Sequence, residues 1–172
     1  MRAAVAVEGR RSFEGGGFAT RAWKPYLALA RAIRHDPTGD TDHVAAVVES
    51  IVGPDVLVID DLQWVDAETL TVLERLIGRI AMVVASRIDD AEAVSRVTRL
   101  TGAGVARLDL GPLETEHAAA IARRSRPGLS TEAARRITER AGGNPLLIEQ
   151  LAAGGKCTGK TVADRKFQPD TR

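Results

Sequence analysis

The stretch VLVIDDLQWVD, residues 56–66, constrains the fold of this chain more than any other part of its sequence. Four apolar residues are followed at once by Asp60 and Asp61, and then by a turn and a helical pattern. A short, continuous apolar run is typical of a parallel strand that is covered on both faces. The ligand crevice of an open α/β sheet lies beyond the carboxyl ends of its strands, so we expect both aspartates there.

The rest of the first two thirds of the chain repeats this strand–helix pattern. Three more buried strands are predicted, at residues 3–9, 80–87 and 105–113. Four helices are predicted, at residues 23–34, 42–52, 65–78 and 89–100. Asp42 and Asp66 are the expected N-caps of two of them. Residues 10–23 read as a glycine-rich loop. Alternating strands and helices predict a parallel α/β sheet.

The pattern changes after Pro112, where helices follow one another without strands. Three helices are predicted, at residues 114–126, 131–141 and 145–153. We therefore expect an α/β core at residues 1–111 and a small helical subdomain at residues 112–153. Residues 154–172 have little hydrophobic periodicity, and we expect them to form a disordered tail.

Composition excludes several classes of function. The net charge is +1 and aromatic residues make up 3% of the chain, so direct nucleic-acid binding is not expected. No apolar run is long enough to cross a membrane. Cys157 is the only cysteine, which excludes a disulfide framework and favours a cytoplasmic protein. The three histidines are scattered and give no metal-ligand spacing.

Asp60, Asp61 and Arg87 are the first candidate site residues. A phosphate-transfer site needs one carboxylate to hold Mg²⁺ and another acid to orient the attacking water, and two adjacent aspartates supply both. Arg87 ends the strand predicted at residues 80–87, so it would lie at the same edge of the sheet and could bind a terminal phosphate. The alternative is that these charges only end strands and face solvent.

The segment GGNPLLIEQL supplies the second candidate group. Asn144 can cap a helix whose first residue is Pro145, and Gly142-Gly143 can end the helix before it. These helix-capping roles explain the residues of the segment without any binding or catalytic function.

Taken in order, these segments resemble the STAND branch of AAA-like P-loop ATPases. These are signal-transduction modules of large bacterial regulators, among them LuxR-type transcription factors and ATPase-linked cyclases. VLVIDDLQWVDAETLTVLERL is similar to the Walker B segment of that family, MVVASR to its sensor strand, LDLGPLETEHA to the entry of its helical lid and GNPLLIEQL to the lid's G-x-P motif. The resemblance covers residues 3–153.

The resemblance implies an ATP- and Mg²⁺-binding module of a regulatory protein. By residue, Asp60 is implied as the metal-linked aspartate, Asp61 as the residue that polarises water and Arg87 as the catalytic sensor. Asn144 and Pro145 are implied on the nucleotide side of the lid, with Pro145 against the adenine. Trp64 is expected to pack beside the site.

The chain departs from the family pattern at its start. The family's first strand and its Walker A loop would precede Ala3, and strand 1 lies in the middle of a sheet ordered 5-1-4-3-2. We therefore expect a P-loop NTPase-type sheet that lacks this strand, and weak or no ATP binding and hydrolysis by the chain alone. Whether the chain is an enzyme is left open.

GGKCTGKT, residues 154–161, fits the spacing of a phosphate-binding loop but not its context. A working loop follows a buried strand and opens a helix, whereas the residues before this motif read as a helix.

Two other classes of function stay open. A non-catalytic module could bind a protein partner, or a second copy, through its helical subdomain or an open sheet edge. A DNA-binding regulator is the weaker alternative, because no basic recognition helix is visible.

Overall fold

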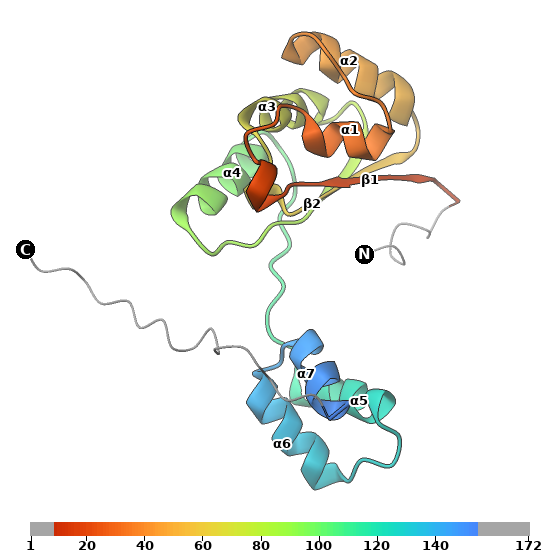
Figure 1. Cartoon of the computed structure of the whole chain (residues 1–172), viewed down its shortest axis with the longest axis vertical. Helices are drawn as coiled ribbons and strands as arrows, with labels where there is room; N and C mark the ends of the chain where they lie inside the picture. The colour runs from red at the N-terminus through yellow and green to blue at the C-terminus, as the bar shows by residue number, and fades with distance from the viewer. Residues whose placement is uncertain (1–8, 155–172) are drawn as a thin grey trace, which may run out of the picture. The chain divides into compact units, whose positions relative to one another are not determined.

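The computed structural model describes residues 9–154 of the 172-residue chain. These residues form an α/β fold with a three-stranded parallel sheet and seven α-helices (Figure 1). They divide into two compact units, unit 1 up to Arg107 and unit 2 from Leu108. Residues 3–8 of the expected first strand, and residues 155–172 with most of GGKCTGKT, lie outside the described residues.

Unit 1 holds the sheet. Its strands are β1 Ser12–Gly16, β2 Val56–Asp60 and β3 Ala81–Val84. Its α-helices are α1 Leu27–Ile33, α2 Thr41–Val52, α3 Ala67–Leu76 and α4 Ala91–Gly102, and its 3₁₀ helices are η2 Ala19–Arg21 and η3 Leu62–Trp64. The strand order is β1-β2-β3, with both neighbouring pairs parallel. The parallel sheet and the strand at residues 56–60 confirm the coarse α/β prediction.

The interpretation of residues 10–23 as a loop is wrong, because Ser12–Gly16 is a strand. In its register with β2, Phe13 lies opposite Leu57 and Gly15 opposite Ile59. Phe13 packs against the core of unit 1, while Ser12 and Glu14 are exposed. Inward and outward residues alternate in Ser12–Gly16, as is usual for a strand. The alternating segment is short and ends in glycines, so its sequence resembles that of a loop.

The core of unit 1 forms where the helices meet one face of this sheet. Leu57 and Ile59 are fully buried on β2, and they belong to the same cluster as Leu29, Val48 and Leu73 from α1, α2 and α3. Figure 1 shows these three helices on one side of the strands. Burying such side chains stabilises the fold by roughly 1.5–3 kcal/mol each.

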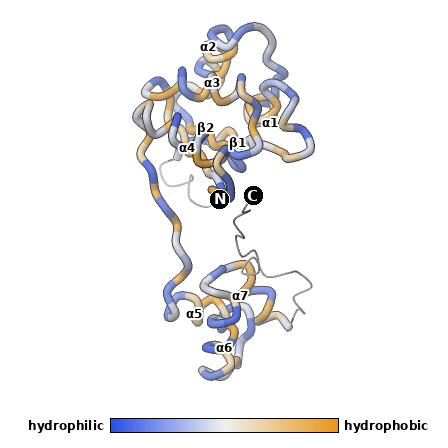
Figure 2. Tube along the Cα trace, turned by 90° about the vertical axis from the view of Figure 1, so that its left-hand side faces the viewer, coloured by the Kyte–Doolittle hydropathy of each residue, from blue (hydrophilic) through white to orange (hydrophobic). Residues whose placement is uncertain are grey.

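Two expectations about the later strands are wrong. β3 was expected to be buried, but it has a strand neighbour on one side only among the described residues, and Val83 is 45% exposed. Residues 105–113 form no strand, although apolar and polar residues alternate there, as the orange and blue stretches between α4 and α5 show (Figure 2). Leu108 and Leu110 are 83% and 89% exposed. An alternating segment becomes a strand only when a neighbour satisfies its backbone groups.

The helix caps follow the sequence closely. Asp66 caps α3 as predicted, because its Oδ1 accepts a hydrogen bond from the Thr69 amide at 2.7 Å. The cap of α2 is Asp40 rather than Asp42, since Asp40 accepts from the His43 amide at 2.8 Å. The helix predicted at residues 23–34 begins only at Leu27, after a turn through the preceding residues.

Unit 2 is a three-helix unit with a small core. Its helices are α5 Thr115–Ser125, α6 Thr131–Ala141 and α7 Pro145–Ala152. The predicted helices are therefore confirmed, with ends that differ by a residue. The buried residues of the core are five alanines and Ile148, namely Ala118, Ala122, Ala134, Ala141, Ile148 and Ala152. Alanines let the helices approach closely, but Ile148 supplies the largest buried apolar side chain.

None of the helices in residues 9–154 combines the length and the apolar character that a membrane span requires.

Candidate functional site

Asp60 and Asp61 stand where β2 ends and the chain turns away from the sheet. Asp60 is the last residue of the strand and is exposed. Its Oδ1 accepts a hydrogen bond from the Asp61 amide at 2.9 Å. Asp61 adopts the left-handed conformation, with φ of 50°, directly before η3. A non-glycine residue is uncommon in this region of φ, and such strain often accompanies functional sites.

The turn is tied to the end of β3. The Ala85 amide donates to the Ile59 carbonyl at 2.9 Å, and the Leu62 amide donates to the Ala85 carbonyl at 3.0 Å. The residues that follow β2 and β3 are therefore held side by side, at the carboxyl edge of the sheet. This is the edge at which the sequence predicts the site.

Gln63 joins the two halves of this edge, and sequence reasoning missed it. It is buried, with 8% of its surface exposed. Its Nε2 donates to Asp61 Oδ1 at 2.8 Å. Its Oε1 accepts from the Arg87 amide at 3.0 Å and from the Ser86 hydroxyl at 3.2 Å. A buried polar side chain with all these partners orients its neighbours.

Arg87 lies beside Asp61, as the order of the strands predicts. Its Nη2 is 3.8 Å from Asp61 Oδ1, and its Nη1 is 4.0 Å from Asp89 Oδ2. The Arg87 side chain is 62% exposed and that of Asp61 45%. An ion pair this long and this exposed adds little to stability. Both side chains are therefore available to a ligand at small energetic cost.

Three consecutive glycines let β1 end close to this edge. A Cβ on Gly15 would lie 2.0 Å from the Ala28 carbonyl oxygen, and one on Gly17 would lie 2.5 Å from the Trp64 carbonyl carbon. The backbone of β1 and the loop after it thus touches α1 on one side and η3 on the other. The sequence shows the glycines, but only the packing shows why no side chain fits there.

Arg11 and Asp55 hold the other end of β1 in register. Asp55 Oδ1 accepts from the Arg11 amide at 2.9 Å, and Oδ2 accepts from Arg11 Nε at 2.9 Å. The hydrogen bond from the Arg11 amide is the main cause that lowers the pKa of the Asp55 carboxyl, and the Arg11 guanidinium lowers it further. This contact joins the start of β1 to the residue before β2, although the two strands are far apart in the chain.

The second candidate group has a complete local explanation in unit 2. The Asn144 side chain accepts from the Leu146 amide at 3.0 Å and from the Leu147 amide at 3.3 Å. Pro145 is the first residue of α7, and Gly142 and Gly143 end α6 with positive φ. These contacts confirm the predicted cap. The nucleotide-binding role of Asn144 and Pro145 stays a prediction.

The donor set at the edge fits a metal ion only in part. The residues between 9 and 154 contain no group of three or more His, Cys, Asp or Glu side chains that could hold a metal. Two exposed carboxylates fit Mg²⁺ that arrives with phosphate oxygens and water, because Mg²⁺ is commonly held by one or two carboxylates plus substrate phosphates. They do not fit a metal that the protein alone retains.

Comparison of the chain with protein-family models, with curated proteins and with solved structures found no match.

Proposed function

We propose that this chain is a segment of a regulatory, signal-transduction ATPase module that binds a magnesium-bound nucleoside triphosphate at the carboxyl edge of its sheet. The observation that carries the proposal is the set Asp61, Gln63 and Arg87. A carboxylate and a guanidinium face one edge of a parallel sheet, and buried Gln63 binds the Asp61 carboxylate and the backbone amide of Arg87. Ligands of open α/β sheets bind at this edge.

The strand order supports the same proposal. In the resembled family the sheet runs 5-1-4-3-2, and β1-β2-β3 corresponds to its strands 2, 3 and 4. The aspartates then follow strand 3 and Arg87 follows strand 4, as the resemblance implies. We expect weak binding of nucleotide and little or no hydrolysis by this chain alone.

Each side chain has a distinct part in the proposed site. Asp60 would hold the magnesium ion, which neutralises phosphate charge when it is bound. Asp61 would accept a hydrogen bond from the attacking water. Gln63 would keep the Asp61 carboxylate in position. Arg87 would bind the terminal phosphate oxygens. Asn144 and Pro145 belong to the proposal as the nucleotide side of the helical subdomain.

The test is a titration of the full chain with ATP, followed by NMR on the Asp61 and Arg87 amides and the Trp64 indole. We expect Mg²⁺-dependent shifts that saturate at millimolar ATP, and loss of those shifts in Asp60→Asn and Asp61→Asn. Asp36→Asn, an exposed aspartate distant in sequence from the edge, is the matched control. The proposal fails if ATP causes no Mg²⁺-dependent shift, or if the edge variants respond like wild type.

A non-catalytic interaction module is the second candidate, and the exposure of β3 favours it. Val83 is 45% exposed on a strand that carries no charge or proline to discourage pairing. If the chain has this function, it should form a dimer. The dimer population should rise with protein concentration and should not depend on nucleotide. Sedimentation of the wild-type chain and of Val83→Lys measures the dimer fraction. If the wild-type chain is a monomer at all concentrations, self-association is excluded.

A further inference from the structure

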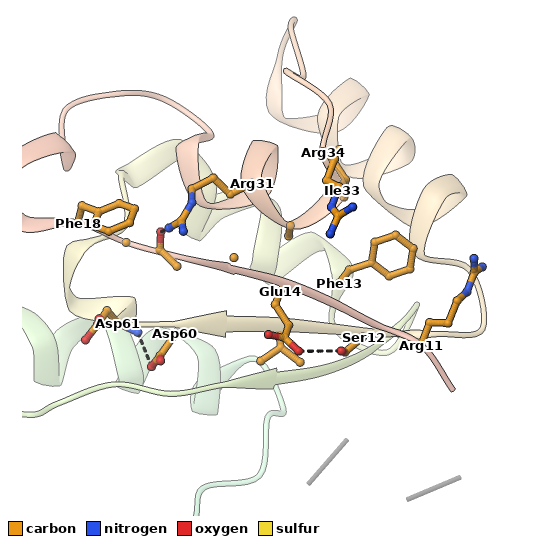
Figure 3. A pocket seen from close by; sticks show the side chains of 15 residues that line it. Arg11, Ser12, Phe13, Glu14, Phe18, Arg31, Ile33, Arg34, Asp60 and Asp61 are labelled. Carbon is orange, nitrogen blue, oxygen red and sulfur yellow. Dashed lines mark hydrogen bonds between the residues drawn. The ribbon is translucent and has the colours of Figure 1, made fainter. Parts of the chain in front are cut away.

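A groove of about 810 Å³ runs along β1 beside α1, and it reaches the aspartate edge at Asp60 and Asp61. We name it the β1–α1 groove. It is lined by residues 11–18, by residues 31–34, and by Val58, Asp60 and Asp61. Figure 3 shows Arg31 and Arg34 on its α1 side, with Asp60 and Asp61 toward the end where Phe18 lies.

Arg31 is held in this groove without a carboxylate partner. Its guanidinium lies 4.4 Å from the centre of the Phe18 ring. Its Nη1 is 3.5 Å from the Gly16 carbonyl oxygen, at the limit of a hydrogen bond. No acidic side chain in the described part of the chain forms an ion pair with it, whereas Arg75 and Arg99 pair with Asp42 and Glu74. Stacking on an aromatic ring leaves the guanidinium edge available for an anion.

Arg34 occupies a position where glycine would cost less. It ends α1 in the left-handed conformation, with φ of 54°, and its amide donates to the Ala30 carbonyl. Glycine is the usual residue there, because other side chains are strained. The non-glycine residues with positive φ in residues 9–154 are Tyr26, Arg34 and Asp61, and the last two both line the groove. Strain of this kind gathers at functional sites.

The backbone of Gly16 faces away from β2, toward Arg31. The Gly17 amide donates to the Asp60 carbonyl, so Gly17 faces β2. Successive residues of a strand direct their backbone groups to opposite edges, and Gly16 therefore directs its N–H away from β2. The contact of Arg31 with the Gly16 carbonyl agrees with this direction. The guanidinium groups that line the groove are donors that suit phosphate oxygens.

We propose that the β1–α1 groove binds a small phosphate-bearing molecule, with Arg31 and Arg34 as its two cationic contacts. The groove borders the proposed magnesium–nucleotide site, because Asp60 and Asp61 line it as well, but its cations are different. Its cations come from α1, beside β1, whereas Arg87 follows β3 on the other flank of β2. The proposal does not depend on magnesium or on a nucleobase.

The test is calorimetric titration of the full chain with inorganic triphosphate in the presence of a metal chelator. We expect saturable binding that weakens at least about tenfold in Arg31→Gln and in Arg34→Gln, because a hydrogen bond to a charged group contributes about 1.5–3 kcal/mol. Arg124→Gln, which removes the same charge from an exposed position on α5, should bind like wild type.

Arg34→Gly separates binding from folding. Glycine adopts the left-handed conformation without strain, so this variant should melt at the wild-type temperature or above it, yet bind triphosphate more weakly. If Arg34 only ends the helix, Arg34→Gly will bind like wild type. Thermal melts of every variant accompany the titrations.

Three further outcomes would overturn the proposal. One is no binding of triphosphate at millimolar concentration, and another is an equal loss in Arg124→Gln. The third is a poly-glutamate peptide that binds more tightly than triphosphate. Asp60→Asn should retain or strengthen binding without metal, because it removes a negative charge that lines the groove. The same Asp60→Asn variant should lose the Mg²⁺-dependent response to ATP that the proposed function predicts. One variant therefore tests the two proposals independently.

Discussion

The side-chain amide of Gln63 donates to the Asp61 carboxylate over 2.8 Å, and both residues belong to the turn that leaves β2. The oxygen of the same amide accepts from the Arg87 backbone, beyond the end of β3. A single buried side chain thus links the Asp61 carboxylate to the backbone from which the Arg87 side chain extends. The candidate site owes its arrangement to this residue more than to the weak ion pair between Asp61 and Arg87.

Replacing Gln63 should loosen this edge. Gln63→Leu keeps much of the volume but leaves the Arg87 amide without its acceptor, while the Ser86 hydroxyl can still donate to the Arg87 carbonyl. An unsatisfied buried group costs about 1–3 kcal/mol, and since the Arg87 amide is only partly buried we expect a loss of about 1 kcal/mol in the free energy of unfolding. Urea denaturation measures it, and hydrogen exchange should quicken at Arg87. Gln150→Leu, an exposed glutamine on α7, is the control, and an equal loss there would contradict the assignment.

Gly15 should not tolerate a side chain. The added Cβ of Gly15→Ala would lie 2.0 Å from the Ala28 carbonyl oxygen, and backbone on both sides must move to relieve it. Overpacking costs about 1–3 kcal/mol and occasionally more, and we expect the upper part of this range because the clash is with backbone. Gly102→Ala has no atom within 4 Å of its Cβ and should be neutral or stabilising. Equal melting temperatures for both variants would mean that β1 and α1 are not in contact.

The stability of unit 1 should depend on pH through Asp55. Its pKa is lowered in the folded state, chiefly by the Arg11 amide, so the folded chain binds fewer protons there than the unfolded chain. The stabilisation is present above the unfolded pKa of about 3.9 and is lost as the pH falls through the lower, folded pKa. Asp55→Asn should therefore be less stable than wild type at neutral pH, and this difference should shrink in acid. Urea midpoints at both pH values test it, with Asp36→Asn as the control.

Unit 2 should be sensitive at Ile148. This side chain is fully buried among alanines, and its truncation to alanine leaves a cavity. Ile148→Ala should lower the stability of the unit by about 2–5 kcal/mol. Leu146→Ala, on the same helix but 61% exposed, should change it by less than about 0.5 kcal/mol. Hydrogen exchange of α5, α6 and α7 distinguishes the two, and equal protection in both variants would mean that Ile148 is not the centre of the core.

The sequence by itself determined the elements whose signals are local. Asp66 and Asn144 cap helices as predicted, because a cap is satisfied by amides two or three residues away. The strand at residues 56–60 and the two aspartates at its end were also predictable, since a continuous apolar run needs no partner to be recognised. Whether those aspartates bind a nucleotide stays a prediction.

Only the tertiary structure decided the features that depend on distant partners. Residues 12–16 become a strand because β2, which lies 44 residues further along the chain, pairs with them, and residues 105–113 do not because the described residues supply no neighbour. Gln63 acquires its role from Ser86 and Arg87, 23 and 24 residues away. A strand or a positioned side chain exists only when its backbone and polar groups find partners, and those partners meet only after the chain has folded.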